Sequence, residues 1–452
     1  MAKKKLLIFA HYYAPDTAST GQILKDQAEG MLDEFNVTVI CVVPSYGGMI
    51  EEKYKIQKYY FEELNGVKII RVRVPEFTKA NKISRIKNIV SYFFGALGAA
   101  MKAGKQDYVF TISQPPILGG LLGVLGKRMK HAKMIYCIQD FNPEQVMAVN
   151  YSKNKFVLWV MMVTDKFSCK HSDLIITVGR DLVETLKERF NGKNVPKYVM
   201  INNWIDEREI YPLESDHEKV MAFRKQYGLE DKFVIMYSGN IGLYYDLENL
   251  LKVIEKFHPG TKAADGREVV FAFVGAGAVL DKLLLYRNEH HMDNVIFIPY
   301  QDKADLIYSL NAGDVHWVVN SKGIKGVSCP SKFYGCASSA RPVLAVLESG
   351  SEIRMLIEET GCGLFCEPEE YDKVEANIRW FIDNAGSGKL IEMGWNGRTY
   401  LEKHLTKDIS IQKYIEEIKA LVLQCCPIST KFVVYDIYGY AKNLCSAIQY
   451  FI

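Results

Sequence analysis

Apolar and polar positions along the chain form an alternating series of strand-like and helix-like segments. The strand-like segments are short, nearly continuous apolar runs rich in β-branched residues, which are typical of parallel strands buried on both faces. In the first half these runs are KLLIFAHYY, NVTVICVVP, DYVFTIS, KMIYCIQD, DLIITVG and KYVMINN. In the second half they are FVIMYSG, EVVFAFVGAG, NVIFIPY, VHWVVN, PVLAVL and CGLFCEP. The pattern predicts α/β domains in which parallel strands alternate with crossover helices.

A change in composition divides this series into two halves. The stretch NWIDEREIYPLESDHEK is polar and rich in turn residues, and the alternation restarts after it. A chain of 452 residues is also too long for a single hydrophobic core. We therefore expect two doubly wound sheets, with a ligand site in a cleft between them beyond the carboxyl ends of the strands. The predicted parts are a first domain at 1–204, a second domain at 205–404, a closing helix at 405–424 and an aromatic tail at 425–452.

Composition and charge exclude several classes of protein. With 48% hydrophobic and 24% charged residues, the chain has the composition of a folded globular protein. A net charge of only +3 argues against nucleic acid as the main partner. The ten cysteines lack the spacing of a zinc site or a disulfide framework, which favours reduced thiols in a cytoplasmic protein. The basic start MAKKKLLIFA resembles a signal peptide, but its apolar run is short, and no run reaches the ~20 apolar residues of a transmembrane helix.

Seven short motifs follow one another in an order that resembles one enzyme family. They are YYAPDTASTGQ, IQDFNPEQVMAVN, INNWIDEREIYP, YSGNIGLYYDLENLL, FAFVGAGAVLDKL, VIFIPYQDKADL and PSKFYGCASSARPVLA. Together they resemble the family 4 glycosyltransferases, which have the GT-B fold, and especially a subgroup that adds sugars to bacterial cell-surface polysaccharide precursors of the colanic-acid and capsule type. The likeness extends from about Lys4 to about Leu421. It implies two facing Rossmann-like domains with an interdomain cleft.

The resemblance also implies roles for individual residues. Asp140, Pro143 and Glu144 match an Asp-x-x-Pro-Glu segment that faces the cleft in relatives, and Asn203 and Asp206 match the signature that enters the second domain. The residues expected to bind the donor are Gly21, Gly239, Asn240, Gly242, Gly275, Pro299, Tyr300, Ser331 and Tyr334. The residues expected to act in catalysis are Asp140 and Lys332, and those expected on the acceptor side are His11 and Glu144.

The sequence departs from the family pattern at several positions. Many relatives carry two glutamates, eight positions apart, that hold the donor sugar and the ribose hydroxyls, and here Val327 and Gly335 stand at those positions. Relatives also often hold the diphosphate with an Arg and a Lys, and here Asn240 and Tyr245 stand near their places. Trp204 replaces a glycine of the signature at the domain boundary. The roles of the two glutamates are therefore not carried over, and this chain has fewer cations than its relatives for holding the diphosphate.

The loop GVSCPSKF, residues 326–333, contains no acid and no general base, yet it suits one kind of chemistry. When a sugar leaves a nucleoside diphosphate, negative charge grows on the diphosphate. Backbone N–H groups, helix N-termini and a fixed cation stabilise such charge. Lys332 supplies the cation; the alternative is that it is an ordinary solvated surface lysine. Because the chain has no Asp-x-Asp motif, we expect no metal or other cofactor.

Three residues of the first half have a functional and an ordinary interpretation. Asp140 ends an apolar strand, where functional residues of α/β sheets gather, but it could also be a turn or N-cap residue. His11 also ends a strand and is either an acceptor contact or a buried neutral histidine. Glu144 is equally well suited to the first turn of a helix.

Two apolar segments with basic ends suggest contact with a membrane surface. They lie at 82–105 and 115–133, and each combines apolar positions with several Lys or Arg residues. Ordinary packed helices are one interpretation. Peripheral association with an anionic membrane, where lipid-linked acceptors are found, is the other.

The sequence thus predicts a retaining glycosyltransferase of the hexosyltransferase type. We expect a nucleoside diphosphate sugar as donor, with UDP as the nucleotide, and a lipid-linked or polysaccharide-precursor acceptor. Two alternatives remain: a GT-B homologue of weakened activity that acts as a binding or scaffold subunit, and a nucleotide-sugar epimerase. The missing carboxylates at Val327 and Gly335 favour the first alternative, and the scarcity of acids and histidines in the expected cleft argues against the second.

Overall fold

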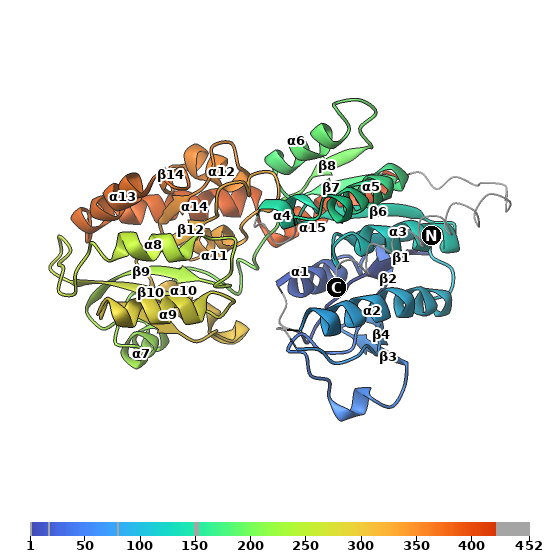
Figure 1. Ribbon diagram of the computed structural model, residues 1–452, viewed down its shortest axis with the longest axis horizontal. Coiled ribbons are helices and arrows are strands. Elements are labelled where there is room, and N and C mark those ends of the chain that lie inside the picture. The colour runs from blue at the N-terminus through green and yellow to red at the C-terminus, as the bar shows by residue number, and fades with distance from the viewer. Residues whose placement is uncertain (1, 17–18, 79–80, 149–152, 422–452) are drawn as a thin grey trace. The chain divides into compact units, whose positions relative to one another are not determined.

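The computed structural model describes residues 2–16, 19–78, 81–148 and 153–421. They form two compact units, which Figure 1 shows with their elements labelled. The first unit comprises Met1–Val178, Leu182–Ile201 and Ser410–Ile452, and the second comprises Gly179–Asp181 and Asn202–Ile409. The aromatic tail predicted at 425–452 lies outside the described residues.

The first unit contains an eight-stranded sheet in the order β3-β4-β2-β1-β5-β6-β7-β8. All neighbouring strands pair in parallel except the edge pair β3 and β4, which is antiparallel. The strands are β1 (Lys4–Phe9), β2 (Phe35–Val42), β3 (Tyr59–Leu64), β4 (Val67–Val72), β5 (Tyr108–Ile112), β6 (Lys133–Ile138), β7 (Leu174–Thr177) and β8 (Tyr198–Met200).

Helices cover both faces of this sheet (Figure 1). The helices α2 and α3 pack on one face through a cluster that includes Tyr92, Phe93 and Leu122, while Tyr414 of α15 lies against Phe110 of β5 on the other. The helices with residues in this unit are α1 (Ser19–Gly30), α2 (Lys82–Lys102), α3 (Leu118–Lys130), α4 (Glu144–Ala148), α5 (Lys155–His171), α6 (Arg180–Arg189) and α15 (Lys407–Lys419), with a short 3-10 turn, η1 (Glu52–Tyr54).

The second unit contains a six-stranded parallel sheet in the order β11-β10-β9-β12-β13-β14. Counted from its own first strand, this order is 3-2-1-4-5-6, that of a doubly wound dinucleotide-binding fold. The strands are β9 (Lys232–Ser238), β10 (Glu268–Val274), β11 (Val295–Ile298), β12 (Val315–Val319), β13 (Val343–Val346) and β14 (Gly363–Cys366). The prediction of an α/β protein with two doubly wound sheets is therefore confirmed.

Alternating residues of the central strand β9 serve the two faces of the second sheet. Phe233, Ile235 and Tyr237 pack with α8, α9 and α13, whereas Val234 and Met236 pack with α7 and α10. The helices are α7 (Glu218–Gln226), α8 (Leu247–Ile254), α9 (Leu280–Glu289), α10 (Leu306–Ala312), α11 (Lys332–Ser338), α12 (Glu352–Thr360), α13 (Tyr371–Asp383) and α14 (Gly388–His404), with a 3-10 turn, η2 (Lys303–Asp305).

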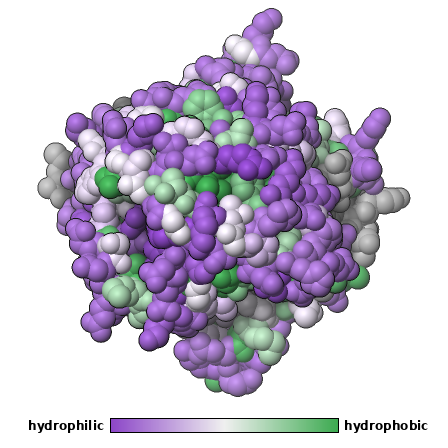
Figure 2. Space-filling model, turned by 90° about the vertical axis from the view of Figure 1, so that its left-hand side faces the viewer, coloured by the Kyte–Doolittle hydropathy of each residue, from purple (hydrophilic) through white to green (hydrophobic). Residues whose placement is uncertain are grey.

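The surface seen in Figure 2 is mostly hydrophilic, with apolar side chains scattered rather than gathered into one continuous patch. Such scattered apolar residues are normal on a protein surface and need no partner. In the described part of the chain, no helix is both long and apolar enough to span a membrane.

Candidate active site

In the second unit, the expected donor-binding residues gather at the carboxyl ends of β9, β10 and β12. The strands β9 and β12 are neighbours in the sheet, and the strand order reverses between them. In open α/β sheets this reversal leaves a crevice at the carboxyl ends of the strands, where ligands bind. Gly239 follows β9, Gly275 follows β10, and Lys332 begins the helix that follows β12.

Two glycines allow the loops after β9 and β10 to pack directly on each other. Gly239 has a φ of +137° and Gly275 a φ of +143°, a region that side chains rarely permit. A Cβ atom on Gly275 would lie 2.0 Å from the carbonyl oxygen of Gly239. Their amides are already used: Gly239 donates to the carbonyl of Val274 and Gly275 to that of Ile298, each at 2.9 Å. These glycines therefore shape the loops rather than offer their own N–H groups to a ligand.

Lys332 lies across Gly239 and beneath aromatic rings. Its Nζ is 3.6 Å from the centroid of the Tyr245 ring and 5.1 Å from that of Tyr237. A Cβ atom on Gly239 would lie 2.7 Å from Lys332 Cε, so a larger residue there would displace the end of this side chain. Burial lowers the pKa of Lys332 to about 7, and among the described residues no carboxylate opposes this effect. The site therefore holds an amine that lacks an acidic partner.

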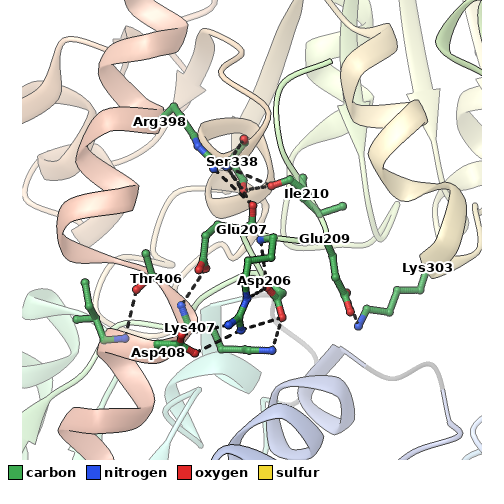
Figure 3. Close-up of polar contacts among 12 residues, drawn as sticks. Asp206, Glu207, Glu209, Ile210, Lys303, Ser338, Arg398, Thr406, Lys407 and Asp408 are labelled. Atoms are coloured by element: carbon green, nitrogen blue, oxygen red, sulfur yellow. Dashed lines mark hydrogen bonds and ion pairs between the residues drawn. The ribbon is translucent and has the colours of Figure 1, made fainter. Parts of the chain in front are cut away.

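A second layer of contacts holds α11, the helix that carries Lys332 (Figure 3). Arg398 of α14 donates to the carbonyl oxygen of Ser338 at 2.8 Å and to that of Ile210 at 3.2 Å. The hydroxyl of Ser338 also donates to the carbonyl of Ile210, at 2.6 Å. Because Ser338 is the last residue of α11, these bonds fix the far end of the helix and thereby support Lys332 at its start.

The motif INNWIDEREIYP contributes to the same layer (Figure 3). The carboxylate of Asp206 accepts hydrogen bonds from Arg208 Nε at 3.0 Å and from the ammonium of Lys407. Burial alone would raise the pKa of Asp206, but these two cations lower it to about 2. Asn203 and Trp204 are buried. In this structure the motif acts as a structural anchor rather than as a ligand site.

The remaining donor-site predictions separate into exposed and buried positions. Ser331 is exposed immediately before α11, and Tyr300 is 60% exposed just after β11, next to Pro299. Asn240 and Gly242 lie in the loop after β9, and a Cβ on Gly242 would lie 2.8 Å from Asn240 Nδ2. Tyr334 is instead buried in the core beside β12 and β13. It can support the site only through packing.

The two positions that lack the relatives' glutamates are not equivalent. Val327 is buried in the loop between β12 and α11. Gly335 faces the core, since a Cβ there would lie 3.2 Å from Leu310 Cδ1 and 3.7 Å from Ile205 Cδ1. A carboxylate at Gly335 would therefore begin among apolar side chains, an unfavourable place for a charge.

The first unit has its own cavity, of about 200 Å³, at the corresponding point of its sheet. Its walls come from the segments after β1 and β5, which are neighbours where the strand order reverses, together with α2 and the segment after β6. The lining residues are His11, Tyr12, Phe77, Arg85, Asn88, Ile89, Ser113, Gln114, Pro115, Pro116, Asp140, Asn142 and Gln145. The mixture of aromatic rings with amide, hydroxyl and charged groups suits a polar ligand with apolar faces.

His11 and Asp140, predicted from the ends of their strands, both line this cavity. His11 is 6% exposed, and burial lowers its pKa to about 4, with a side-chain hydrogen bond to Asn88 acting in the opposite direction. Its Nε2 atom has no hydrogen-bond partner among the described residues. Asp140 is half-buried, and its amide donates to Ser113 Oγ at 3.2 Å. Since α4 begins at Glu144, Asp140 is too far upstream to be its N-cap.

Glu144 does not line the cavity. Its carboxylate accepts a hydrogen bond from Arg189 Nε at 3.0 Å, and Arg189 also forms a buried ion pair with Asp165. Gly21 likewise has a structural reason to be glycine, because a Cβ there would lie 3.1 Å from the carbonyl oxygen of Tyr12. Both residues maintain the first unit, and neither is directed at the cavity.

Sequence reasoning missed several residues that the structure brings to these sites. Tyr237 and Tyr245 enclose Lys332, while Arg85, Asn88 and Gln145 line the first cavity. Of these residues, only Tyr245 had a signal in the sequence, because it stands near a position where relatives carry a cation that holds the diphosphate. No group of three His, Cys, Asp or Glu side chains that could hold a metal exists among the residues placed in the structure, and metal independence stays a prediction.

Two curated proteins are similar to this chain over most of its length. WbjE of Pseudomonas aeruginosa, named as a probable glycosyltransferase, is 25% identical over 352 residues, which cover 77% of this chain and 84% of WbjE. WcaI of Escherichia coli K12, named as a putative colanic acid biosynthesis glycosyl transferase, is 23% identical over 427 residues, covering 92% of this chain and all of WcaI. No protein-family model matches the chain.

Solved structures agree in fold at low sequence identity. Sucrose-phosphate synthase of Thermosynechococcus elongatus superposes with a TM-score of 0.72 at 14% identity, covering 92% of this chain and 98% of the synthase. HepE of Anabaena, solved in complex with UDP and glucose, superposes with a TM-score of 0.65 at 14% identity, covering 92% of this chain and all of HepE. These solved structures confirm the GT-B fold, and the two curated relatives confirm the resemblance to glycosyltransferases of bacterial cell-surface polysaccharides.

Proposed function

Because the chain is a glycosyltransferase with the GT-B fold, we propose that it transfers a sugar, with retention of configuration, from a UDP-linked donor to a lipid-linked or polysaccharide-precursor acceptor. The name of WcaI supports a role in building cell-surface polysaccharide. The complex of HepE with UDP and glucose supports UDP as the nucleotide. Retention of configuration follows from the resemblance in the sequence motifs.

The observation that carries the proposal is the amine of Lys332 beside the glycine loops, which has no acidic partner among the described residues. In the reaction, the bond between the anomeric carbon and the diphosphate oxygen breaks, and its electron pair stays on the diphosphate. The acceptor oxygen forms the new bond and loses its proton. A protonated Lys332 stabilises the negative charge on the leaving diphosphate.

The cavity of the first unit is the proposed place for the acceptor. Its aromatic residues Tyr12 and Phe77 offer apolar faces, and Ser113, Asp140 and Gln145 offer hydrogen-bonding groups. Sugars present this combination, with hydroxyls at their edges and C–H groups on their faces. His11 remains neutral at physiological pH, because burial lowers its pKa to about 4, so it contributes a hydrogen bond rather than a charge.

Replacing Lys332 tests this function. Lys332→Ala should lower turnover about ten- to a hundredfold, since a hydrogen bond to a charged group contributes roughly 1.5–3 kcal/mol. The assay measures UDP released from a panel of UDP-sugars in the presence of a membrane extract that contains acceptors. Lys322→Ala is a matched control, because Lys322 lies on the same loop but is exposed and paired with Glu369.

Four outcomes decide between functions. Loss of turnover in Lys332→Ala but not in Lys322→Ala supports the proposal, whereas equal turnover in both variants refutes the role of Lys332. If the unmodified protein binds UDP but releases none from any donor, it is a binding or scaffold subunit, the alternative that Val327 favours. Conversion of one UDP-sugar into its epimer without UDP release would make it an epimerase.

The proposal includes a cytoplasmic location with peripheral contact to an anionic membrane, through one face of α2. Ile83, Phe94 and Met101 are 44%, 62% and 69% exposed, and helical spacing places them on one side with the exposed Lys87. The second segment suggested by the sequence is less suitable, because the apolar residues of α3 are largely buried. Binding to vesicles with anionic lipid should weaken in Phe94→Ser and at high salt. Equal vesicle binding by the unmodified protein and Phe94→Ser would show that this face of α2 does not contact the membrane.

A further inference from the structure

We propose that Tyr245 is a positioning residue that encloses the amine of Lys332, so that the second unit takes up a proton when it binds a nucleoside diphosphate. The inference rests on the proposed function, because it assumes that the diphosphate meets Lys332. To the proposed function it adds the role of Tyr245, which acts through Lys332, and the uptake of one proton when the nucleotide binds.

The enclosure of the amine is a property of three elements. Tyr237 comes from β9, Tyr245 from the loop between β9 and α8, and Lys332 from the first turn of α11. The Tyr245 centroid lies 3.6 Å from Nζ and the Gly239 backbone lies beneath the chain of Lys332, so these groups cover part of the surroundings of the amine, and the residue as a whole is half-buried. The face of the Tyr245 ring attracts an ammonium, but it replaces less of the lost hydration than an anion would, so the charged form remains costly without an anion beside it.

The groups that face the amine do not replace that missing anion. Burial raises the pKa of Tyr237 well above its usual value and that of Cys336 to about 12, so both stay protonated and uncharged near neutral pH. The nearest carboxylate along the loop, Asp246, is held by hydrogen bonds from Tyr371 Oη and Asn249 Nδ2, each at 2.7 Å. Lys332 itself has a pKa lowered by burial to about 7.

A diphosphate changes this balance. Placed beside Lys332, its negative charge favours the ammonium form over the amine. Above pH 7 the apoprotein holds mostly the neutral amine, so binding transfers one proton from solvent to Nζ. When the diphosphate leaves, the proton returns to solvent, and the net reaction is unchanged.

Tyr245 is the part of the enclosure that a substitution can remove without cutting into the sheet. It is half-buried in a loop, whereas Tyr237 is fully buried in the core cluster. Tyr245→Phe keeps the ring over Lys332 and should preserve the effect. Tyr245→Ala opens the enclosure to water, so the pKa of Lys332 should rise toward the usual value of about 10.4.

The test is calorimetric titration with UDP between pH 7.5 and 9, where the terminal phosphate of UDP, with a pKa near 6 as for other phosphate monoesters, is already ionised. Each titration is run in two buffers of different ionisation enthalpy, which gives the number of protons taken up. In the unmodified protein, uptake should approach one proton per UDP at pH 9, and the Kd should rise up to tenfold per pH unit. Tyr245→Phe should match it, while Tyr245→Ala should take up less than half a proton at pH 8.

The outcomes separate the two proposals. If the unmodified protein does not bind UDP at any of these pH values, the proposed donor site is wrong, and this inference falls with it. If UDP binds with the same proton uptake in Tyr245→Ala as in Tyr245→Phe, the donor site stands and the positioning role of Tyr245 is refuted. Lys332→Ala should show no uptake, and uptake that persists in it would assign the proton to another group. Thermal unfolding of each variant verifies that it is folded.

Discussion

Substitution of Gly275 by alanine tests the packing that shapes the donor loops. Two costs add together at this position. A non-glycine residue with φ near +143° is strained by about 1–3 kcal/mol, and overpacking adds about 1–3 kcal/mol because the new Cβ would lie 2.0 Å from the carbonyl oxygen of Gly239. Gly275→Ala should therefore lower the free energy of unfolding by about 2–6 kcal/mol. For a unit of about 200 residues, each kcal/mol lowers Tm by roughly 2–4 °C.

Gly266→Ala provides the comparison, because it carries the strain without the clash. Gly266 has a φ of +85°, and no atom lies within 4 Å of the position its Cβ would occupy. Scanning calorimetry of both variants should show that Tm falls further in Gly275→Ala, by at least about 2 °C, and UDP titration should show weaker binding in Gly275→Ala alone. Equal falls in Tm with unchanged UDP affinity would mean that the two loops do not depend on the contact between Gly275 and Gly239.

Three further predictions concern cofactors, pH and a buried ion pair. UDP release should continue in EDTA, and its loss in EDTA with recovery on adding Mg²⁺ or Mn²⁺ would contradict metal independence. Burial lowers the pKa values of His11 and His316 to about 4, so only the unfolded chain takes up these protons as the pH falls from 6.5 to 4. The free energy of unfolding should therefore drop by up to ~3 kcal/mol for each histidine over this range. In urea unfolding, the His11→Gln, His316→Gln double variant should show a smaller drop than the unmodified protein. Arg189→Leu should cost about 3–5 kcal/mol in the same assay, because Asp165 and Glu144 lose their buried partner, and a loss below 1 kcal/mol would exclude that role.

The sequence predicted the parallel strands well because burial on both faces leaves continuous apolar runs. It missed β3, whose half-exposed and exposed positions lack such a run, and it also missed β4, although β4 is largely buried and pairs in parallel with β2. The signal for this pair was the dipeptide Asn65–Gly66, which joins the two strands as a two-residue turn with φ values of +52° and +86°. Asn-Gly is the residue pair that such hairpin turns favour. The apolar runs therefore identified most of the buried strands but neither strand of this hairpin.

The sequence predicted site residues correctly placed at a sheet edge only where those residues come just after a strand. His11, Asp140 and Gly239 follow their strands within two residues, and the structure places each at the carboxyl edge of its sheet, with His11 and Asp140 lining the cavity of the first unit. The enclosure of Lys332 depends on the rotamer of Tyr245, a residue far away in the sequence, and no local pattern encodes that contact. Glu144 shows the reverse case. Its position near Asp140 suggested a contact with a ligand, but its carboxylate forms an ion pair with Arg189, which lies far away in the sequence.

The first unit is not a continuous piece of chain, and this has a consequence for how the protein is made. Its last described helix, α15, begins at Lys407, yet Tyr414 packs on Phe110, Ile411 fills the space beside Gly30, and Lys419 pairs with Glu34. On the ribosome, residues 1–201 emerge long before these contacts exist, so the area of the first sheet around Phe110 lacks the cover of α15 while the second unit is synthesised and folds. A fragment ending at Ile201 would leave this apolar area permanently without that cover, and isolating the first unit requires the segment from Ser410 to be supplied as well.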